Sequence, residues 1–337
     1  MLEDILNKSV PDLEVRENSN KTFRMLASKT ADFFNGFIDI LIKSKDISQQ
    51  QELIEELISS LPVPMQKLYK KGVESFLRQV KKNHENLEQT KGKEKELLMI
   101  GLIKSILIQT NNYSDANLKI TFNKMMADQQ HFEYSELVPG IPMLKINNEF
   151  LQLLSGNVED FGMFCSTPVI SFIVSGADDV SDKISKHELS HCIFYFLTKD
   201  NYLREANDIE KNNFQWFCEE IVGYILSKDF KKRDFVKKYV FGDSSNLNGV
   251  FLQLDDQESL KKVNDILKAI FMFMMSGHRL NIKMDNFIYP CLISRNFDEL
   301  LDNCGRIVPQ AETKKMIEEI ETEKIDLDKL IDDFCQD

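Results

Sequence analysis

The sequence predicts a mostly helical α+β protein with a small mixed sheet. Apolar residues recur at helical spacing over most of the chain, and three short segments near its middle have the alternation or the β-branched content of strands. With 337 residues, the chain is long enough to bury a full core and to hold two regions. We expect a helical N-terminal module over residues 1–112 and a mixed region with a helical C-terminal part over residues 113–337.

The N-terminal module is predicted to contain a run of helices between residues 21 and 110. Aromatic and aliphatic side chains repeat there every three or four residues. Pro62 and Pro64 end the second helix, a third follows over residues 65–88, and a fourth runs over residues 94–110. We interpret the apolar stripes of these helices as core, and docking of a partner on one of them is the alternative.

Three segments that follow this module are predicted to be strands, at residues 118–122, 141–146 and 169–174. The first alternates apolar and polar residues, and the third is β-branched and aromatic. A free edge on the third strand would let it pair with an extended peptide. Its nearly continuous apolar character favours a fully buried central strand equally, so both interpretations are kept.

Helices are expected again from residue 214 onward, at residues 214–227, 259–275 and 313–334. Six basic residues between positions 228 and 238 predict a local basic face, which is either a solvated helix surface or a surface for an acidic partner. The acidic stretch 318–337 carries interleaved apolar residues, and we expect it to be a helical cap or a mobile tail.

The composition indicates a soluble globular protein rather than a nucleic-acid binder. The formal net charge is −12 and 42% of the residues are hydrophobic, so the average surface repels polyanions. The six cysteines lie far apart without a paired spacing, which is typical of reduced thiols in a cytoplasmic protein. The sequence from Met1 lacks the pattern of a secretory signal, and the most apolar runs, 97–103 and 269–275, are too short to span a membrane. We therefore expect a cytoplasmic protein without a membrane span.

The strongest functional signal is the pentapeptide His187-Glu188-Leu189-Ser190-His191. Histidines four residues apart on a helix lie on one face, so their imidazole nitrogens can converge on one ion. Glu188 follows the first histidine directly, which places its carboxylate beside the ion, where it can take a proton from a metal-bound water. A helix predicted over residues 183–198, with its apolar stripe away from the histidines, gives the motif the context that it requires.

The residues around this motif also allow an interpretation without a metal, in which Glu188 has a purely structural role. Ser185 and Glu188 have the spacing of a capping box, which would begin the helix at Lys186 and occupy the glutamate structurally. Ser181 and Asp182 offer an earlier N-cap, and the apolar periodicity already begins before the box. We therefore favour the metal interpretation.

A catalytic zinc ion takes three protein ligands and keeps one position open, so one more donor is needed. A third histidine at the short metzincin spacing is absent, because that position is Leu197. Glu219 is the preferred donor because it lies on an apolar helix, with Trp216 three residues before it and Gly223 four residues after it. The acidic residues within range are Glu205, Glu210, Glu219 and Glu220.

Through the pentapeptide and residues 216–226, the chain resembles the zincin metallopeptidases, and specifically their glutamate-ligand branch, the gluzincins. The resemblance implies a zincin-like catalytic region with an active-site helix, and Zn²⁺ as the cofactor. It implies that Glu188 is the general base and that the zinc ligands are His187, His191 and Glu219.

The chain departs from many gluzincins at Gly223, where those enzymes carry an aspartate four residues after the ligand glutamate. That aspartate forms a hydrogen bond to a metal-bound histidine and so fixes the orientation of its ring. Its replacement by glycine leaves both Glu219 and Glu220 open as the third ligand.

Further side chains are secondary candidates. His278, the last histidine of the chain, is expected to donate a hydrogen bond to the oxyanion, with Tyr195 and Tyr224 as rivals and a surface histidine as the alternative. Cys192 and Cys218 flank the predicted ligands. Neighbouring helix positions point about 100° apart, so both are expected to be core thiols.

The first interpretation of function is a zinc-dependent endopeptidase that acts on a protein or peptide substrate, with Glu188 passing a proton from water to the leaving amine. The alternative is a helical interaction protein in which the pentapeptide is vestigial or accidental. A third hypothesis is a peptidase that bacteria deliver into a host cell without an N-terminal signal peptide, as an effector. The acidic, partly apolar stretch 318–337 is compatible with such delivery.

Overall fold

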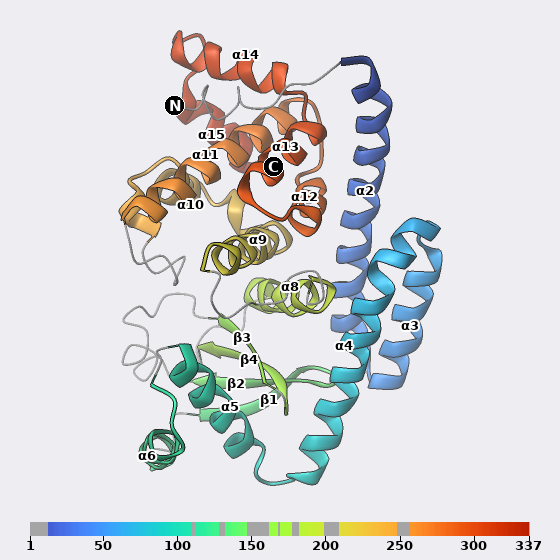
Figure 1. Ribbon diagram of the computed structural model, residues 1–337, viewed down its shortest axis with the longest axis vertical. Helices are drawn as coiled ribbons and strands as arrows, with labels where there is room; N and C mark the ends of the chain where they lie inside the picture. Colours follow the sequence, from blue (N-terminus) through green and yellow to red (C-terminus); the bar gives the residue numbers. More distant parts are fainter. Residues whose placement is uncertain are drawn as a thin grey trace. The chain divides into compact units, whose positions relative to one another are not determined.

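The computed structural model is a mostly helical α+β structure with one four-stranded sheet among the described residues, as the sequence predicts (Figure 1). Its contacts divide it into two compact units. The sheet unit is Gly36–Lys199, and the helical unit is formed by Met1–Asn35 and Asp200–Asp337. The structure describes residues 13–109, 112–127, 132–146, 162–167, 169–176, 182–198, 209–247 and 257–336.

The predicted N-terminal helices are present as α2 (Leu13–Lys43), α3 (Ile47–Ser60), α4 (Val63–Gln89) and α5 (Glu94–Gln109). The two units meet between residues 35 and 36 and between residues 199 and 200, whereas the predicted boundary lies between residues 112 and 113. Both α4 and α5 pack directly on strands of the sheet, and α3 packs on α4. The helices α3, α4 and α5 therefore belong to the same unit as the sheet, whereas α2 is divided between the two units after Asn35.

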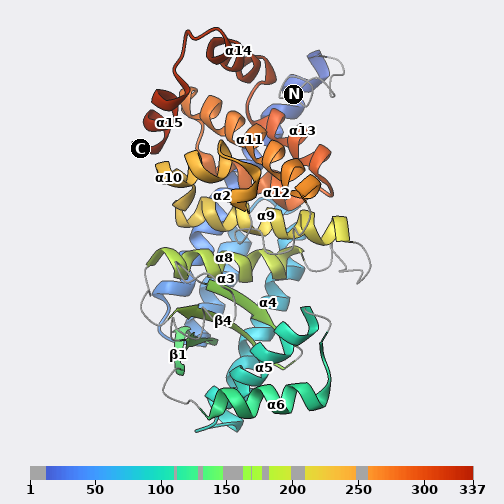
Figure 2. The same ribbon diagram turned by 90° about the vertical axis from the view of Figure 1, so that its left-hand side faces the viewer.

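Helix α6 (Asp115–Met126) corrects the strand predicted at residues 118–122. Ser114 caps the helix by accepting a hydrogen bond from the Asn117 backbone N–H at 3.1 Å. Leu118 and Phe122 pack against the core beside α5, whereas Ile120 is 66% exposed. The two packed residues are four apart, as residues on one face of a helix are, and the apparent alternation arises because the exposed Ile120 lies between them. Figure 2 shows α6 beside α5.

The sheet contains β1 (Phe132–Val138), β2 (Ile141–Ile146), β3 (Gly162–Ser166) and β4 (Ser171–Gly176), in the order β1-β2-β4-β3. The strands β1 and β2 form an antiparallel hairpin that turns at Gly140, whose φ of 75° suits a residue without a side chain. β2 and β4 are parallel, and β3 and β4 are antiparallel. The sheet is therefore mixed, as predicted.

The strand predicted at residues 169–174 is β4, and it lies between β2 and β3. All six of its residues are buried. The interpretation of this strand as a free edge for a substrate is therefore wrong, and the interpretation as a central strand is confirmed. A continuous apolar run has no polar side to turn to water, which is why it occupies the interior of the sheet.

The helical unit contains the returning helices that were expected from residue 214 onward. Its long helix α11 (Gln257–Arg279) is central, and the methionines at positions 272, 274 and 275 are buried in its core. The unit also contains α9 (Ile209–Ser227), η2 (Asp229–Lys231), α10 (Arg233–Phe235), η3 (Val236–Val240), η4 (Ser244–Leu247), η5 (Met284–Phe287), α12 (Ile288–Ile293), α13 (Phe297–Ile307), α14 (Gln310–Glu321) and α15 (Leu327–Gln336).

The helix predicted at residues 313–334 is in fact two helices, α14 and α15. Glu323 has a φ of 54°, in the left-handed region that interrupts a helix. The Asp326 side chain accepts a hydrogen bond from the Asp328 backbone N–H at 2.8 Å and so begins the new helix. Leu330, Ile331 and Phe334 are buried, so this stretch is the helical cap rather than the mobile tail.

All six cysteines are free thiols, and five of them are buried. None of the described helices combines the length and the apolar character needed to cross a membrane. These observations agree with the expected reduced cysteines and with the expected absence of a helical span in the part of the chain that the structure describes.

Asn83 fastens α4 to the sheet. Its side-chain amide donates hydrogen bonds to the carbonyls of Gly140 at 2.9 Å and Ser171 at 2.7 Å, and its oxygen accepts one from the Ser171 N–H at 3.0 Å. The Gln79 side chain donates a further bond to the same oxygen at 2.9 Å. Because Asn83 is only 2% exposed, water cannot replace these bonds when the side chain is removed.

We predict that Asn83→Ala lowers the free energy of unfolding by about 2–4 kcal/mol, because it leaves buried backbone groups without partners. Urea denaturation followed by circular dichroism measures this loss. The matched control is Asn86→Ala, on the same helix, which removes one solvent-exposed hydrogen bond to Val169 and should cost less than about 1 kcal/mol. Equal losses for the two variants would contradict the role of Asn83.

Candidate metal centre

The pentapeptide lies on α8 (Asp182–Thr198), close to the helix predicted over residues 183–198. Because α8 already begins at Asp182, a helix that starts at Lys186 with a capping box is excluded. The earlier cap at Ser181 lies outside the described residues. The buried apolar face of α8 includes Leu189 and Ile193, both 0% exposed, as the apolar stripe predicts.

On one side, α8 packs against α4 at very short range. A Cβ atom on Gly72 would lie 2.7 Å from the Cα of Leu197 and 2.8 Å from the carbonyl oxygen of Phe196. Only glycine allows the two backbones to approach this closely. One turn further along α4, the rings of Phe76 and Phe196 meet edge to face with centroids 5.8 Å apart. These contacts fix the position of α8 in the sheet unit.

On another side, α8 packs against β3. The rings of Phe164 on β3 and Tyr195 on α8 have centroids 5.7 Å apart. Burial raises the pKa of the neighbouring Cys165 thiol, and the negative charge of Glu188 raises it further. The carboxylate of Glu188 therefore lies near Cys165 on β3. Figure 1 shows α8 running beside this edge of the sheet.

His187, Glu188 and His191 come together on α8. One donor atom from each of the three residues lies within 4.8 Å of the others. The two imidazole rings have centroids 4.7 Å apart and are inclined at 70°. Glu188 is 3% exposed and His191 is 7% exposed, whereas His187 is half-buried. Two donors that each lie about 2.0–2.1 Å from one zinc ion are at most about 4.2 Å apart, so these donor atoms lie close to the separation that a shared ion requires.

The chemistry of this donor set fits a metal ion. Imidazole nitrogen and carboxylate oxygen are both ligands of divalent transition metals. An ionised carboxylate that is removed from water requires compensating charge or hydrogen bonds, and a cation beside Glu188 supplies such compensation. The buried group formed by His187, Glu188 and His191 can therefore hold a metal ion, which agrees with the sequence prediction of a metal cofactor.

Ser190, in the middle of the motif, serves the helix rather than the metal. Its hydroxyl is buried and donates a hydrogen bond to the His187 carbonyl oxygen at 2.5 Å. Cys192 is 2% exposed, and burial raises the pKa of its thiol. Cys218 is 0% exposed, and its thiol hydrogen-bonds to Cys291. Both flanking cysteines are therefore core thiols, as the sequence predicts.

The predicted third ligand belongs to the helical unit. Glu219 lies on α9, is 6% exposed, and accepts a hydrogen bond from the Gln215 side chain at 2.8 Å. Glu220 is half-buried. The burial of Glu219 agrees with the apolar helix face that made it the preferred donor, and its role as a ligand stays a prediction. The rival Glu205 and the side chain of Glu210 lie outside the described residues.

The oxyanion candidates are spread over both units. His278 lies in the last turn of the helix α11, and its ring packs edge to face on Phe334 with centroids 5.6 Å apart. Tyr195 packs on β3, and Tyr224 packs on Phe235 with centroids 4.7 Å apart. The role predicted for His278 stays a prediction.

Two features that position the site were missed from the sequence. The strand β3 was not expected, because Gly162–Ser166 neither alternates nor contains a β-branched residue. The close approach at Gly72 was not expected either, although a glycine inside a helix is itself a signal of close packing.

No protein-family model, no curated protein and no solved structure matches this chain.

Proposed function

We propose that this protein is a zinc-dependent metallopeptidase, and more narrowly an endopeptidase. The observation that supports the proposal is the grouping of donor atoms from His187, Glu188 and His191 within 4.8 Å on one largely buried helix face. Two imidazoles with an adjacent carboxylate are the residue types that metal-assisted hydrolysis requires, at the spacing that one helix face provides.

Zinc is the metal that we propose, because imidazole ligands suit it and because hydrolysis needs no redox change. His187 and His191 would hold the ion, and Glu219 is the proposed third ligand. When bound, zinc supplies the Lewis acidity that polarises a carbonyl and lowers the pKa of water.

Glu188 has the role of general base. Its carboxylate lies beside the imidazole donors and so stands within reach of a water in the site. It takes a proton from that water and returns it to the leaving amine of the cleaved bond. Its burial keeps the carboxylate away from bulk solvent, so proton transfer is directed to groups inside the site.

The edge strand β3 is the proposed place for an extended peptide. Among the described residues, β3 pairs with β4 on one side only, and it packs beside α8. A peptide added to the other edge would form main-chain hydrogen bonds and run close to the metal group. The substrate that we propose is thus a protein segment in an extended conformation, and the net charge of −12 disfavours a nucleic acid. The cytoplasm, which suits free thiols, is the proposed compartment.

Glu188→Gln is predicted to retain zinc and to lose at least about 99% of peptide cleavage, because the amide cannot accept the proton of water. Cleavage is measured on a mixed peptide library by mass spectrometry, and zinc is measured by titration with a fluorescent chelator. The matched control is Glu74→Gln, the same change at an exposed position of α4, which should cleave like the wild type. Cleavage by Glu188→Gln at the native rate would refute the mechanism.

A second prediction concerns the third ligand. Glu219→Ala should weaken zinc binding by more than about 100-fold, because it removes a charged donor, whereas Glu220→Ala should weaken it by at most about 10 to 100-fold. Competition titration against a chelator of known affinity measures both values. A larger loss for Glu220→Ala than for Glu219→Ala would reject this ligand and leave the two histidines in place.

A further inference from the structure

The helix α15 is an acidic amphipathic helix that docks on a basic and aromatic surface of the helical unit. Its apolar residues Leu330, Ile331 and Phe334 are buried. The Phe334 ring packs on Phe230 with centroids 5.9 Å apart and on Phe271 with centroids 6.2 Å apart. The acidic residues of α15 lie one turn apart beside this apolar face, so the helix presents both kinds of contact to the same surface.

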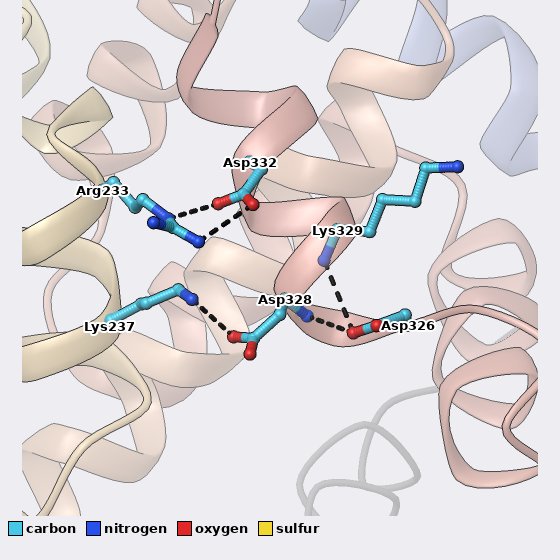
Figure 3. A network of polar contacts seen from close by, with 6 residues as sticks. All are labelled: Arg233, Lys237, Asp326, Asp328, Lys329 and Asp332. Atoms are coloured by element: carbon cyan, nitrogen blue, oxygen red, sulfur yellow. Dashed lines mark hydrogen bonds and ion pairs between the residues drawn. The ribbon is translucent and has the colours of Figure 1, made fainter.

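Two ion pairs join α15 to the basic face predicted between residues 228 and 238 (Figure 3). The Arg233 guanidinium contacts both carboxylate oxygens of Asp332, with one nitrogen–oxygen distance of 3.0 Å. The Lys237 ammonium lies 2.8 Å from the Asp328 carboxylate. The Lys237 ammonium lowers the pKa of Asp328 by hydrogen bonding and by its charge. The basic face therefore has an acidic occupant within the chain itself.

The surface under α15, formed by Phe230, Arg233, Lys237 and Phe271, is here called the α15 seat. It is held in place by contacts that do not involve α15. The Asn264 amide on α11, which is buried, donates hydrogen bonds at 3.2 Å to the carbonyls of Tyr239 and Val240. The ring of Phe230 packs on Phe271 as well as on α15, with centroids 6.4 Å apart.

One residue of the α15 seat, Lys237, lies on the short π-helix η3, Val236–Val240. The Phe241 N–H donates to the Val236 carbonyl at 3.0 Å across the wide turn. Val236 and Val240 are both 0% exposed, so this turn is anchored in the core. Lys237 lies on this anchored turn, whose hydrogen bonds to Asn264 and within η3 do not involve α15. Such π-helical turns are frequent at functional sites.

Fewer contacts hold α15 than hold the α15 seat in the core. Only three of its ten residues are buried, and it is joined to α14 by residues 322–326. Its ion pairs are partly open to solvent, since the exposed fractions of the side chains are 70% for Asp328 and 32% for Lys237, and 55% for Arg233 and 33% for Asp332. Exposed pairs contribute little to stability and are screened by salt. Ordering ten residues costs backbone entropy that few buried side chains offset.

We propose that the α15 seat is a docking site for an acidic amphipathic helix of a partner protein, and that α15 is its displaceable internal occupant. The partner helix carries acidic residues four apart, as Asp328 and Asp332 are, and apolar residues that replace the three buried side chains of α15. This proposal is independent of the metal centre, and its test requires no enzymatic activity.

The test uses the full-length chain and a fluorescent peptide with the sequence of residues 322–337. Binding is measured by fluorescence anisotropy. Asp332→Lys replaces the attraction to Arg233 by repulsion between two cations and so weakens the docking of α15. This variant should bind the peptide at least about tenfold tighter than the wild type, whose own helix competes. The matched control is Asp333→Lys, the same change at the next and exposed residue, which should bind like the wild type. Arg233→Glu combined with Asp332→Lys restores an ion pair within the chain and should return binding to the wild-type level or below.

Two outcomes would overturn the proposal. One is peptide binding by Asp332→Lys that is no tighter than binding by Asp333→Lys. The other is equal binding of a scrambled peptide or of a single-stranded oligonucleotide, since either would reduce the site to a general attraction for negative charge.

Hydrogen exchange of the wild-type chain tests the docking of α15 without any substitution. The amides of α15 should exchange at least about tenfold faster than those of α11, and excess peptide should accelerate α15 alone. Exchange of α15 and α11 at one common rate, unchanged by the peptide, would show α15 to be a permanent part of the fold and would overturn the proposal.

Discussion

The burial of Glu188 and His191 on α8 is the constraint around which the sheet unit is arranged. Ionisable side chains are rarely removed from water unless other groups compensate them, and they need a rigid frame to stay in one position. The frame here consists of α4, whose Gly72 allows backbone contact with α8, and of β3, whose Phe164 packs on the same helix. The sheet in turn is held to α4 by Asn83. The donor group is thus supported by the core rather than by loops, as a preorganised site requires.

The parts of this protein that local spacing determines were predictable, and the parts that depend on tertiary contact were not. His187, Glu188 and His191 meet because residues one turn apart on a helix are neighbours, so the sequence alone predicted their grouping. Helix α6 was mistaken for a strand because alternation over five residues does not reveal that Leu118 and Phe122 face α5. The strand β3 has no strand signature and exists through its pairing with β4. Glu219 lies on another element, so no spacing rule relates it to the histidines.

The helical unit contains a local cluster of basic residues in an otherwise acidic chain. The net charge of the chain is −12, and yet six basic residues lie between positions 228 and 238. Two of the six, Arg233 and Lys237, form ion pairs with α15, which bring together opposite charges from distant parts of the sequence. A solvated surface and an acidic-partner surface were the two interpretations of this face, and its occupant within the chain is an acidic helix.

The central claim is that His187 and His191 hold a metal ion. Metal analysis by mass spectrometry of the wild-type chain, purified without added metal, tests it most directly. About one zinc per chain is expected for the wild type and for His84→Ala, an exposed histidine on α4, and none for His187→Ala combined with His191→Ala. A folded wild-type chain that contains no zinc and takes up none in a titration would contradict the claim and would favour an interaction protein with an accidental motif.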